Sequence, residues 1–240
     1  MRIAYVKEPP FNDVDPSGDV VGCDIELARF VCARLNEPFD PIETEFSDLL
    51  PGLMARRWNM TTGLFATDAR RKTVLFSRPV WALSDGFLVR AGNPFDLSGY
   101  RALADHPLAT LAVIRDQVQH QTALEIGIPE ERIKVFATYD EAAGAVGSAA
   151  VDAYASVARA HAGFIQQNPN IDAEYLTVPE CEKPPEFGCF AVNKQDRDLL
   201  ANVNRILEGY IGTSVHCEMM AGFGFSTTDI DLVRLEWHDP

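Results

Sequence analysis

The chain has 240 residues, of which 47% are hydrophobic and 23% charged, a composition typical of a globular protein with one sizeable core or two modest ones. Its formal net charge of −14 argues against nucleic acids and anionic membranes as partners, because both attract basic surfaces. No apolar run approaches the roughly 20 residues of a membrane-spanning helix. The first residues lack a basic-then-apolar signal segment, so we expect either a mature or truncated product or a cytoplasmic protein.

The first part of the chain alternates strand and helix patterns. The expected elements are strands at 2–6, 41–46, 59–65 and 86–92, and helices at 23–35 and 47–58. We expect Asp24 and Ser47 to cap the two helices, because their side-chain oxygens can accept hydrogen bonds from free backbone N–H groups. Asn93-Pro94 then marks a boundary.

A second alternating series follows that boundary. Its expected strands are 110–114, 132–138, 151–157 and 174–179, with helical segments at 119–126, 140–150 and 158–168 between them. A further strand at 187–194 and an amphipathic helix at 198–211 complete the pattern. Alternation of this kind is typical of α/β proteins with mostly parallel sheets flanked by helices.

The two series predict two lobes, one inserted into the other. Lobe one is expected to comprise 1–89 and 189–240, and lobe two 93–186, with hinge crossings near 86–92 and 187–194. Small molecules bind α/β proteins at the carboxyl ends of strands and between domains, so a ligand cleft is expected between the lobes.

Two stretches carry a resemblance to a known family. Pro10-Phe11, Gly18 and Val21–Leu27 resemble an opening of the form PF…G…GFDVDLA, and Gly63–Lys72 with Phe76–Pro79 resembles GMTITPERKKxxxFSxPY. Together they resemble the polar amino-acid class of periplasmic solute-binding proteins, family 3 type, that feed ABC transporters. The resemblance covers essentially the whole chain and implies the two-lobed type II periplasmic-binding fold.

Arg70 is the position that the resemblance implies for binding a ligand carboxylate. The residue types agree with that role: Thr67 can cap a short helical turn, and a planar guanidinium matches a carboxylate in bidentate fashion. An ordinary surface salt bridge is the alternative, and we favour that alternative for Arg71 and Lys72.

The resemblance also implies an aromatic-lined pocket. Phe11, Phe46 and Phe65 match its wall positions, with Gly63 opening the second motif, although Phe11 could equally be core. Glu8 with these rings is similar to the arrangement in ectoine-binding members, where a glutamate and aromatic faces hold a delocalised cation. The alternative is that Glu8 is only a solvated loop charge.

Lobe two departs from the family pattern. Amino-acid binders usually hold the α-amino group with an acidic residue, but the matching position is Val157, beside Ser156. After the strand at 110–114, Asp116 replaces a usual glycine, which puts the backbone path in doubt. Gln117 is the expected direct contact; Arg115 could contact ligand or merely pair with Asp116, and Ser156 is a further candidate.

The five cysteines and five histidines show no metal-ligand spacing, so no metal or cofactor is expected. Cys181 and Cys189 bracket a Pro-rich loop and could bridge in an oxidising compartment. No GxSxG, P-loop or GxGxxG motif supports a hydrolase, NTPase or dinucleotide function.

We therefore predict a monomeric, non-enzymatic solute-binding protein of an ABC importer, located in the periplasm or outside the cell. It would close around a small zwitterionic amino acid or derivative, ectoine included, and would be recognised by a membrane permease. One alternative is a lyase resembling cyclohexadienyl dehydratase on the same fold, with Glu8 as general acid. The other is a ligand-sensing receptor domain.

Overall fold

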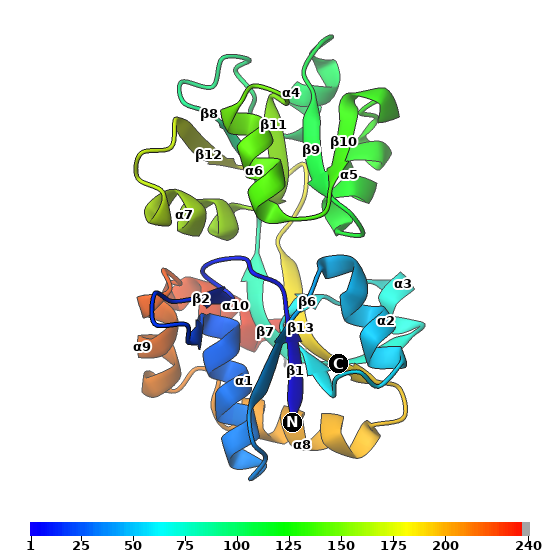
Figure 1. Ribbon diagram of the computed structural model, residues 1–240, viewed down its shortest axis with the longest axis vertical. Coiled ribbons are helices and arrows are strands. Elements are labelled where there is room, and N and C mark those ends of the chain that lie inside the picture. The colour runs from blue at the N-terminus through cyan, green and yellow to red at the C-terminus, as the bar shows by residue number, and fades with distance from the viewer. Residues whose placement is uncertain (237–240) are drawn as a thin grey trace. The chain divides into compact units, whose positions relative to one another are not determined.

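The computed structural model describes residues 1–236, so the last four residues of the predicted range 189–240 lie outside the described part of the chain. It shows an α/β protein that divides into two compact units. Among the described residues, unit 1 comprises 1–82 and 186–236, and unit 2 comprises Leu83–Pro185. Helices flank the sheet of each unit (Figure 1).

The sheet of unit 1 has the strand order β4-β1-β5-β13-β6, and β7 also pairs with β13. Its strands are β1 (Arg2–Tyr5), β4 (Asp40–Glu43), β5 (Met60–Thr61), β6 (Leu64–Phe65), β7 (Val74–Leu83) and β13 (Glu186–Asn193). The strand β1 runs parallel to β4 and β5, whereas β13 runs antiparallel to β5 and β6. A separate hairpin joins β2 (Asp13–Val14) to β3 (Val20–Val21).

Unit 1 contains helices of different lengths. They are α1 (Cys23–Arg34), the 3-10 turn η1 (Phe46–Asp48), α2 (Leu49–Met54), α3 (Asp68–Arg71), α8 (Arg197–Glu208), α9 (Ser214–Gly222) and α10 (Thr227–Glu236). The helix α1 buries Leu27, Ala28, Val31 and Cys32, which lie on one face at spacings of one, three and four residues, so its apolar spacing explains its position against the core.

The sheet of unit 2 has the order β10-β9-β11-β8-β12. Its strands are β8 (Asp85–Arg90), β9 (Leu111–Ile114), β10 (Ile133–Phe136), β11 (Ala153–Val157) and β12 (Ala173–Thr177). Its helices are α4 (Tyr100–Asp105), α5 (Val118–Ile126), the 3-10 turn η2 (Glu130–Arg132), α6 (Tyr139–Gly147) and α7 (Ala158–Gln167). The strand β9 is parallel to β10 and β11, and β8 is antiparallel to β11 and β12.

The structure corrects the expected role of residues 86–92. Strand β8 pairs with β11 on one side and β12 on the other, so it is an inner strand of unit 2 and not a hinge crossing. The chain instead passes from unit 1 to unit 2 at 82/83, before β8, and returns at 185/186. The difference arises because a short apolar run such as Phe87–Val89 has the same pattern in a crossing segment and in a strand that is buried on both faces.

Both expected helix caps are wrong. The N-cap of α1 is Gly22, and no side chain caps the helix. Residues 46–48 form η1, so α2 begins only at Leu49, after Asp48. The strand expected at 59–65 is divided into β5 and β6, and the sequence analysis did not predict β7, α4, α9 or α10.

None of the five cysteines, all of which lie within residues 1–236, forms a disulfide. Cys189 is buried in the core of unit 1, whereas Cys181 is exposed in unit 2, and neither forms the disulfide that the sequence left open. No helix in residues 1–236 is long and apolar enough to cross a membrane.

We expect Gly188→Ala to destabilise the fold by about 1–3 kcal/mol, the usual cost of overpacking a core. A Cβ atom at Gly188 would lie 2.0 Å from the ring of Trp81. Chemical denaturation measures the effect. Gly144→Ala in helix α6 is the control: a Cβ there meets nothing within 4 Å, so this variant should be as stable as the wild type or more so. Equal stability of the two variants would contradict the packing argument.

Candidate functional site

Arg70 is held in place by three neighbours in unit 1. Its backbone N–H donates to Oγ1 of Thr67 at 3.3 Å, so Thr67 caps α3 as the sequence predicts. Its guanidinium donates through Nη1 to the carbonyl oxygen of Phe65 at 2.9 Å and lies 5.2 Å from the ring centroid of Phe46. These contacts fix the plane of the guanidinium, as bidentate binding of a planar anion requires.

Trp81, which the sequence analysis did not select, connects the aromatic candidates. Its ring centroid lies 5.5 Å from that of Phe11 and 5.5 Å from that of Phe65. Phe11 also meets Phe225 edge-on at 6.2 Å and is only 4% exposed, so it is a core residue in this structure. Phe46 is half-buried, beside the guanidinium of Arg70. The aromatic set therefore forms a connected layer that extends from the core to Arg70.

Asp24 ties this layer to the backbone of the second motif. Its carboxylate is fully buried and accepts hydrogen bonds from the Gly63 N–H and from Nε1 of Trp81, each at 2.8 Å. Burial raises the pKa of Asp24 to about 7, although both hydrogen bonds act in the opposite direction. Asp24 is thus a positioning residue beneath the candidate site.

The turn that carries Glu8 is fixed by its own backbone. The carbonyl of Glu8 accepts from the N–H groups of Phe11 and Asn12, and its N–H donates to the carbonyl of Asn12. Backbone N–H groups at the start of α1 then donate to the carbonyls of Pro10 and Phe11, which is why the helix needs no side-chain cap. Glu8 itself is half-buried.

Gly22 makes this junction possible. Its φ is +130°, and a Cβ atom there would lie 2.1 Å from the carbonyl oxygen of Phe11. Only glycine tolerates both the backbone angle and the close approach. The first motif therefore encodes the contact that places Phe11 and Glu8 over α1.

The unit 2 candidates lie at the carboxyl ends of β9 and β11. Arg115 is exposed, and Gln117 is the N-cap residue of α5, where its Oε1 atom is buried with no hydrogen-bond partner among residues 1–236. Ser156 is 2% exposed in β11, opposite Gly86 of β8. Because β9 and β11 are parallel neighbours, the two segments lie at one edge of the sheet.

Asp116 and Val157 are the two positions of unit 2 at which the sequence departs from the family pattern. Asp116 has φ +64°, so it adopts the left-handed conformation that glycine favours, which Asp tolerates better than most residues. Val157 is 7% exposed and begins α7 as an uncharged N-cap. The backbone turn is therefore kept without glycine, whereas the acidic side chain is absent at the matched position.

The first motif and the second meet in unit 1, where the carboxylate of Asp24 accepts the hydrogen bond from Gly63. Asp24 and Trp81 were missed because their partners are distant in sequence. Asp24 resembles a helix cap by position, and Trp81 is 57 residues away from it.

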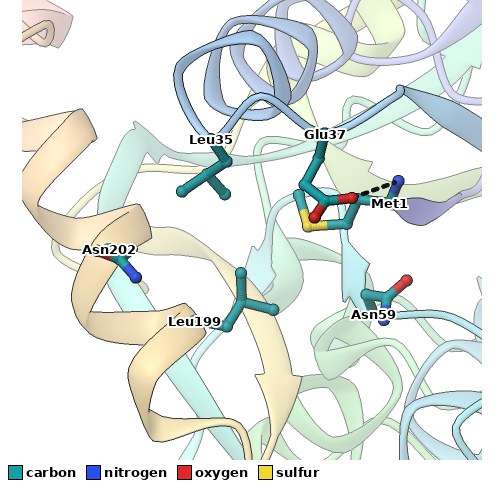
Figure 2. A pocket seen from close by; sticks show the side chains of 6 residues that line it. All are labelled: Met1, Leu35, Glu37, Asn59, Leu199 and Asn202. Atoms are coloured by element: carbon teal, nitrogen blue, oxygen red, sulfur yellow. Dashed lines mark ion pairs between the residues drawn. The ribbon is translucent and has the colours of Figure 1, made fainter.

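A pocket of roughly 370 Å³ lies elsewhere in unit 1 (Figure 2). It is lined by Met1, Leu35, Glu37, Asn59, Leu199 and Asn202. Met1 and Asn59 precede the parallel strands β1 and β5, so the pocket lies at the amino ends of these strands. The candidate residues Glu8 and Gly63 follow the same strands at their carboxyl ends, where α/β proteins bind ligands. The pocket is therefore not the candidate site.

Residues 1–213 match the family of bacterial extracellular solute-binding proteins, family 3. The chain belongs to this family. A probable amino-acid ABC transporter periplasmic-binding protein of Sinorhizobium fredii is 29% identical over 235 residues, covering 94% of this chain and 77% of that protein. The arginine-binding periplasmic protein of Mannheimia haemolytica is 27% identical over 71% of this chain and 73% of its own length.

Solved structures that are similar to this chain have the same fold. EhuB in complex with hydroxyectoine superposes with a TM-score of 0.88 and is 26% identical, covering 96% of this chain and 90% of that chain. A mutant of the arginine-binding protein ArgBP from T. maritima has a TM-score of 0.83 at 22% identity, covering 93% of this chain and 94% of its own, and supports the fold alone. The chain is accordingly an extracytoplasmic solute-binding protein with a type II periplasmic-binding fold.

Asp24 should give the fold a distinctive pH dependence. The folded chain keeps the Asp24 proton up to about pH 7, whereas the unfolded chain releases it near pH 3.8. Between these values the unfolded state binds fewer protons, so this group lowers the free energy of unfolding as pH rises from about 4 to about 7. The wild type should therefore lose stability relative to Asp24→Asn across this window.

Urea denaturation of both proteins from pH 4 to pH 8 measures this difference. Burial lowers the pKa of His161 to about 3 and of His216 to about 4, so both histidines favour folding as pH rises. That effect is common to the two proteins and cancels. Asp24→Asn should also cost about 1–3 kcal/mol at low pH, because one buried N–H loses its acceptor. A pH-independent difference would contradict the assignment.

Proposed function

We propose that the chain captures a small zwitterionic amino acid or amino-acid derivative and delivers it to the membrane permease of an ABC importer. The observation that carries the proposal is the placement of Arg70 in unit 1, held by Thr67 and Phe65 with Phe46 against its guanidinium. An arginine fixed in this way matches a carboxylate, which every amino acid and most of their derivatives carry.

The proposed cation site consists of Glu8 and the aromatic rings. Phe46 and Phe65 lie next to Arg70, and Glu8 is joined to Phe11 by the backbone turn. Aromatic faces and one carboxylate suit a diffuse cation better than a strongly hydrated ammonium. EhuB, which was solved with hydroxyectoine, supports a ligand of this class.

In unit 2, Gln117 is the proposed direct contact, with Arg115 and Ser156 beside it. The buried Oε1 atom of Gln117 lacks a hydrogen-bond partner among residues 1–236, and buried acceptors of this kind are normally satisfied. A donor on the ligand would satisfy it. Val157 supplies no charge, so the proposal assigns the ligand's cation to unit 1.

The protein is proposed to act as a monomer without catalysis, in the periplasm or outside the cell. Its named relatives are periplasmic-binding proteins of amino-acid transporters, which supports both the location and a permease partner. An ancestral amino acid-binding protein described as a precursor of cyclohexadienyl dehydratase shares the fold at 23% identity and a TM-score of 0.82. That similarity concerns the fold and does not favour a lyase over a binding protein.

A ligand panel tests the proposal. Amino acids, ectoine, hydroxyectoine, betaines, prephenate and dicarboxylates are screened by thermal shift and confirmed by calorimetry. A ligand at about 100 times its dissociation constant should stabilise the protein by about 2.7 kcal/mol. Binding of ectoines or betaines supports the cation site. Binding of ordinary amino acids alone contradicts the role of Glu8. Turnover of prephenate contradicts the binding function.

Arg70→Ala should weaken binding of the identified ligand by about 2–5 kcal/mol, because a buried carboxylate loses its charged partner. Arg71→Ala is the matched control. Arg71 is exposed and donates to the carbonyl of Ala66, so its loss should leave affinity within a few tenths of a kcal/mol of the wild type. Calorimetry on both variants measures the difference, and equal affinities would refute the role of Arg70.

A further inference from the structure

Unit 2 contains a buried charge cluster that the proposed ligand contacts do not use. We define the Asp85 cluster as Asp85, Tyr100, Gln119, Thr122 and Lys183. Asp85 is 1% exposed and Lys183 is 8% exposed. Charged residues are seldom buried to this extent unless they are paired, because removing them from water is unfavourable.

Each oxygen of the Asp85 carboxylate has a partner. The Tyr100 hydroxyl donates to Oδ2 at 2.7 Å, and Nζ of Lys183 lies 3.3 Å from the same atom. Nε2 of Gln119 donates to Oδ1 at 2.8 Å. The Lys183 ammonium also donates to Oγ1 of Thr122 at 2.9 Å, so the cluster joins β8, α4, α5 and the loop after β12.

The position of the pair in the chain is informative. Unit 2 begins at Leu83 and ends at Pro185, so Asp85 lies just after the connection that enters the unit and Lys183 just before the one that leaves it. The ion pair therefore ties both connections together at their unit 2 ends. Val178 N–H also donates to the carbonyl of Asp85, which joins the same two segments through the backbone.

The cluster also holds the first two turns of α5. Gln119 and Thr122 belong to that helix, and Gln117 is its N-cap residue. No side chain caps α5. The hydrogen bonds from Gln119 to Asp85 and from Lys183 to Thr122 therefore supply the contacts that hold these two turns from outside the helix. A displaced turn would displace Gln117.

We propose that Asp85 and Lys183 are positioning residues for ligand capture: they hold the two connections and the N-terminal turn of α5 as one rigid body. This inference rests on the proposed function in that Gln117 contacts the ligand. Any movement of one unit relative to the other must be absorbed in the two connections, and the ion pair excludes residues 85–183 from that movement. The hinge is thereby confined to the few residues outside the pair.

Hydrogen exchange of the ligand-free protein tests the rigid body directly. Lys183→Met should raise exchange about tenfold in 83–86, 117–122 and 178–185 together, and leave the remainder of unit 2 as in the wild type. Lys183→Arg keeps the charge and should restore protection. Because Lys183→Met leaves a buried carboxylate without its cation and could fail to fold, the double variant Asp85→Asn/Lys183→Met, which removes both charges, is measured as well.

Arg90→Gln is the matched control. It breaks another ion pair of unit 2, in which Arg90 Nη2 lies 3.7 Å from Asp152, away from the connections. This variant should not raise exchange in the three segments. If hydrogen exchange rises uniformly across unit 2 in both the Lys183 and the Arg90 variants, the pair has a merely structural role and the proposal is overturned. Unchanged exchange in the three segments of the Lys183 variants would also overturn it.

Hydroxyectoine binding provides the second measurement. The double variant should bind it about tenfold more weakly, an effect typical of residues that act on a site without touching the ligand. Wild-type affinity in a double variant whose three segments exchange faster would overturn the link to capture. If the wild-type protein binds no zwitterion of the panel, the proposed ligand class is wrong, and the exchange pattern alone then decides whether the pair forms a rigid body.

Discussion

The buried carboxylate of Asp24 is the interaction on which the candidate site of unit 1 depends. It binds the N–H of Gly63 and Nε1 of Trp81, and its own backbone N–H donates to the carbonyl of Phe11. One residue thus connects the loop that carries Glu8, the start of the second motif and the long strand β7. Because these segments are far apart in sequence, no local propensity could hold them together; a buried, fully bonded acid can.

Unit 2 uses a second buried acid in a different electrostatic setting. The hydrogen bonds of Asp24 come from uncharged donors, and desolvation therefore raises its pKa to about 7. Asp85 is paired with the ammonium of Lys183 in addition to its neutral donors. The first arrangement supports a packed aromatic layer and makes stability pH-dependent. The second places a charge pair where two chain connections meet, which suits a segment that must stay rigid.

The sequence predicted what local chemistry determines. The Thr67 cap followed from a strand, a capping residue and a short helical turn, and the structure has the cap. The role expected of Arg70 came instead from the resemblance to the family. Asp24 was misassigned as a cap because an aspartate at a helix start ordinarily fulfils that role, whereas here backbone carbonyls satisfy the free N–H groups. Strand β8 was misplaced because its apolar run does not reveal that strands pair with it on both sides.

The arrangement of charges in the proposed site limits the class of ligand more than the fold does. A ligand with a localised ammonium needs an acidic partner to offset the loss of its hydration, and Val157 provides none in unit 2. The proposed site instead has one arginine, one glutamate and several rings in a single unit, with both charged groups only half-buried. Rings offset little of the hydration of a compact ammonium but interact well with a cation whose charge is spread over several atoms. On this ground we propose a zwitterion with a delocalised cation as the ligand, in preference to an ordinary α-amino acid.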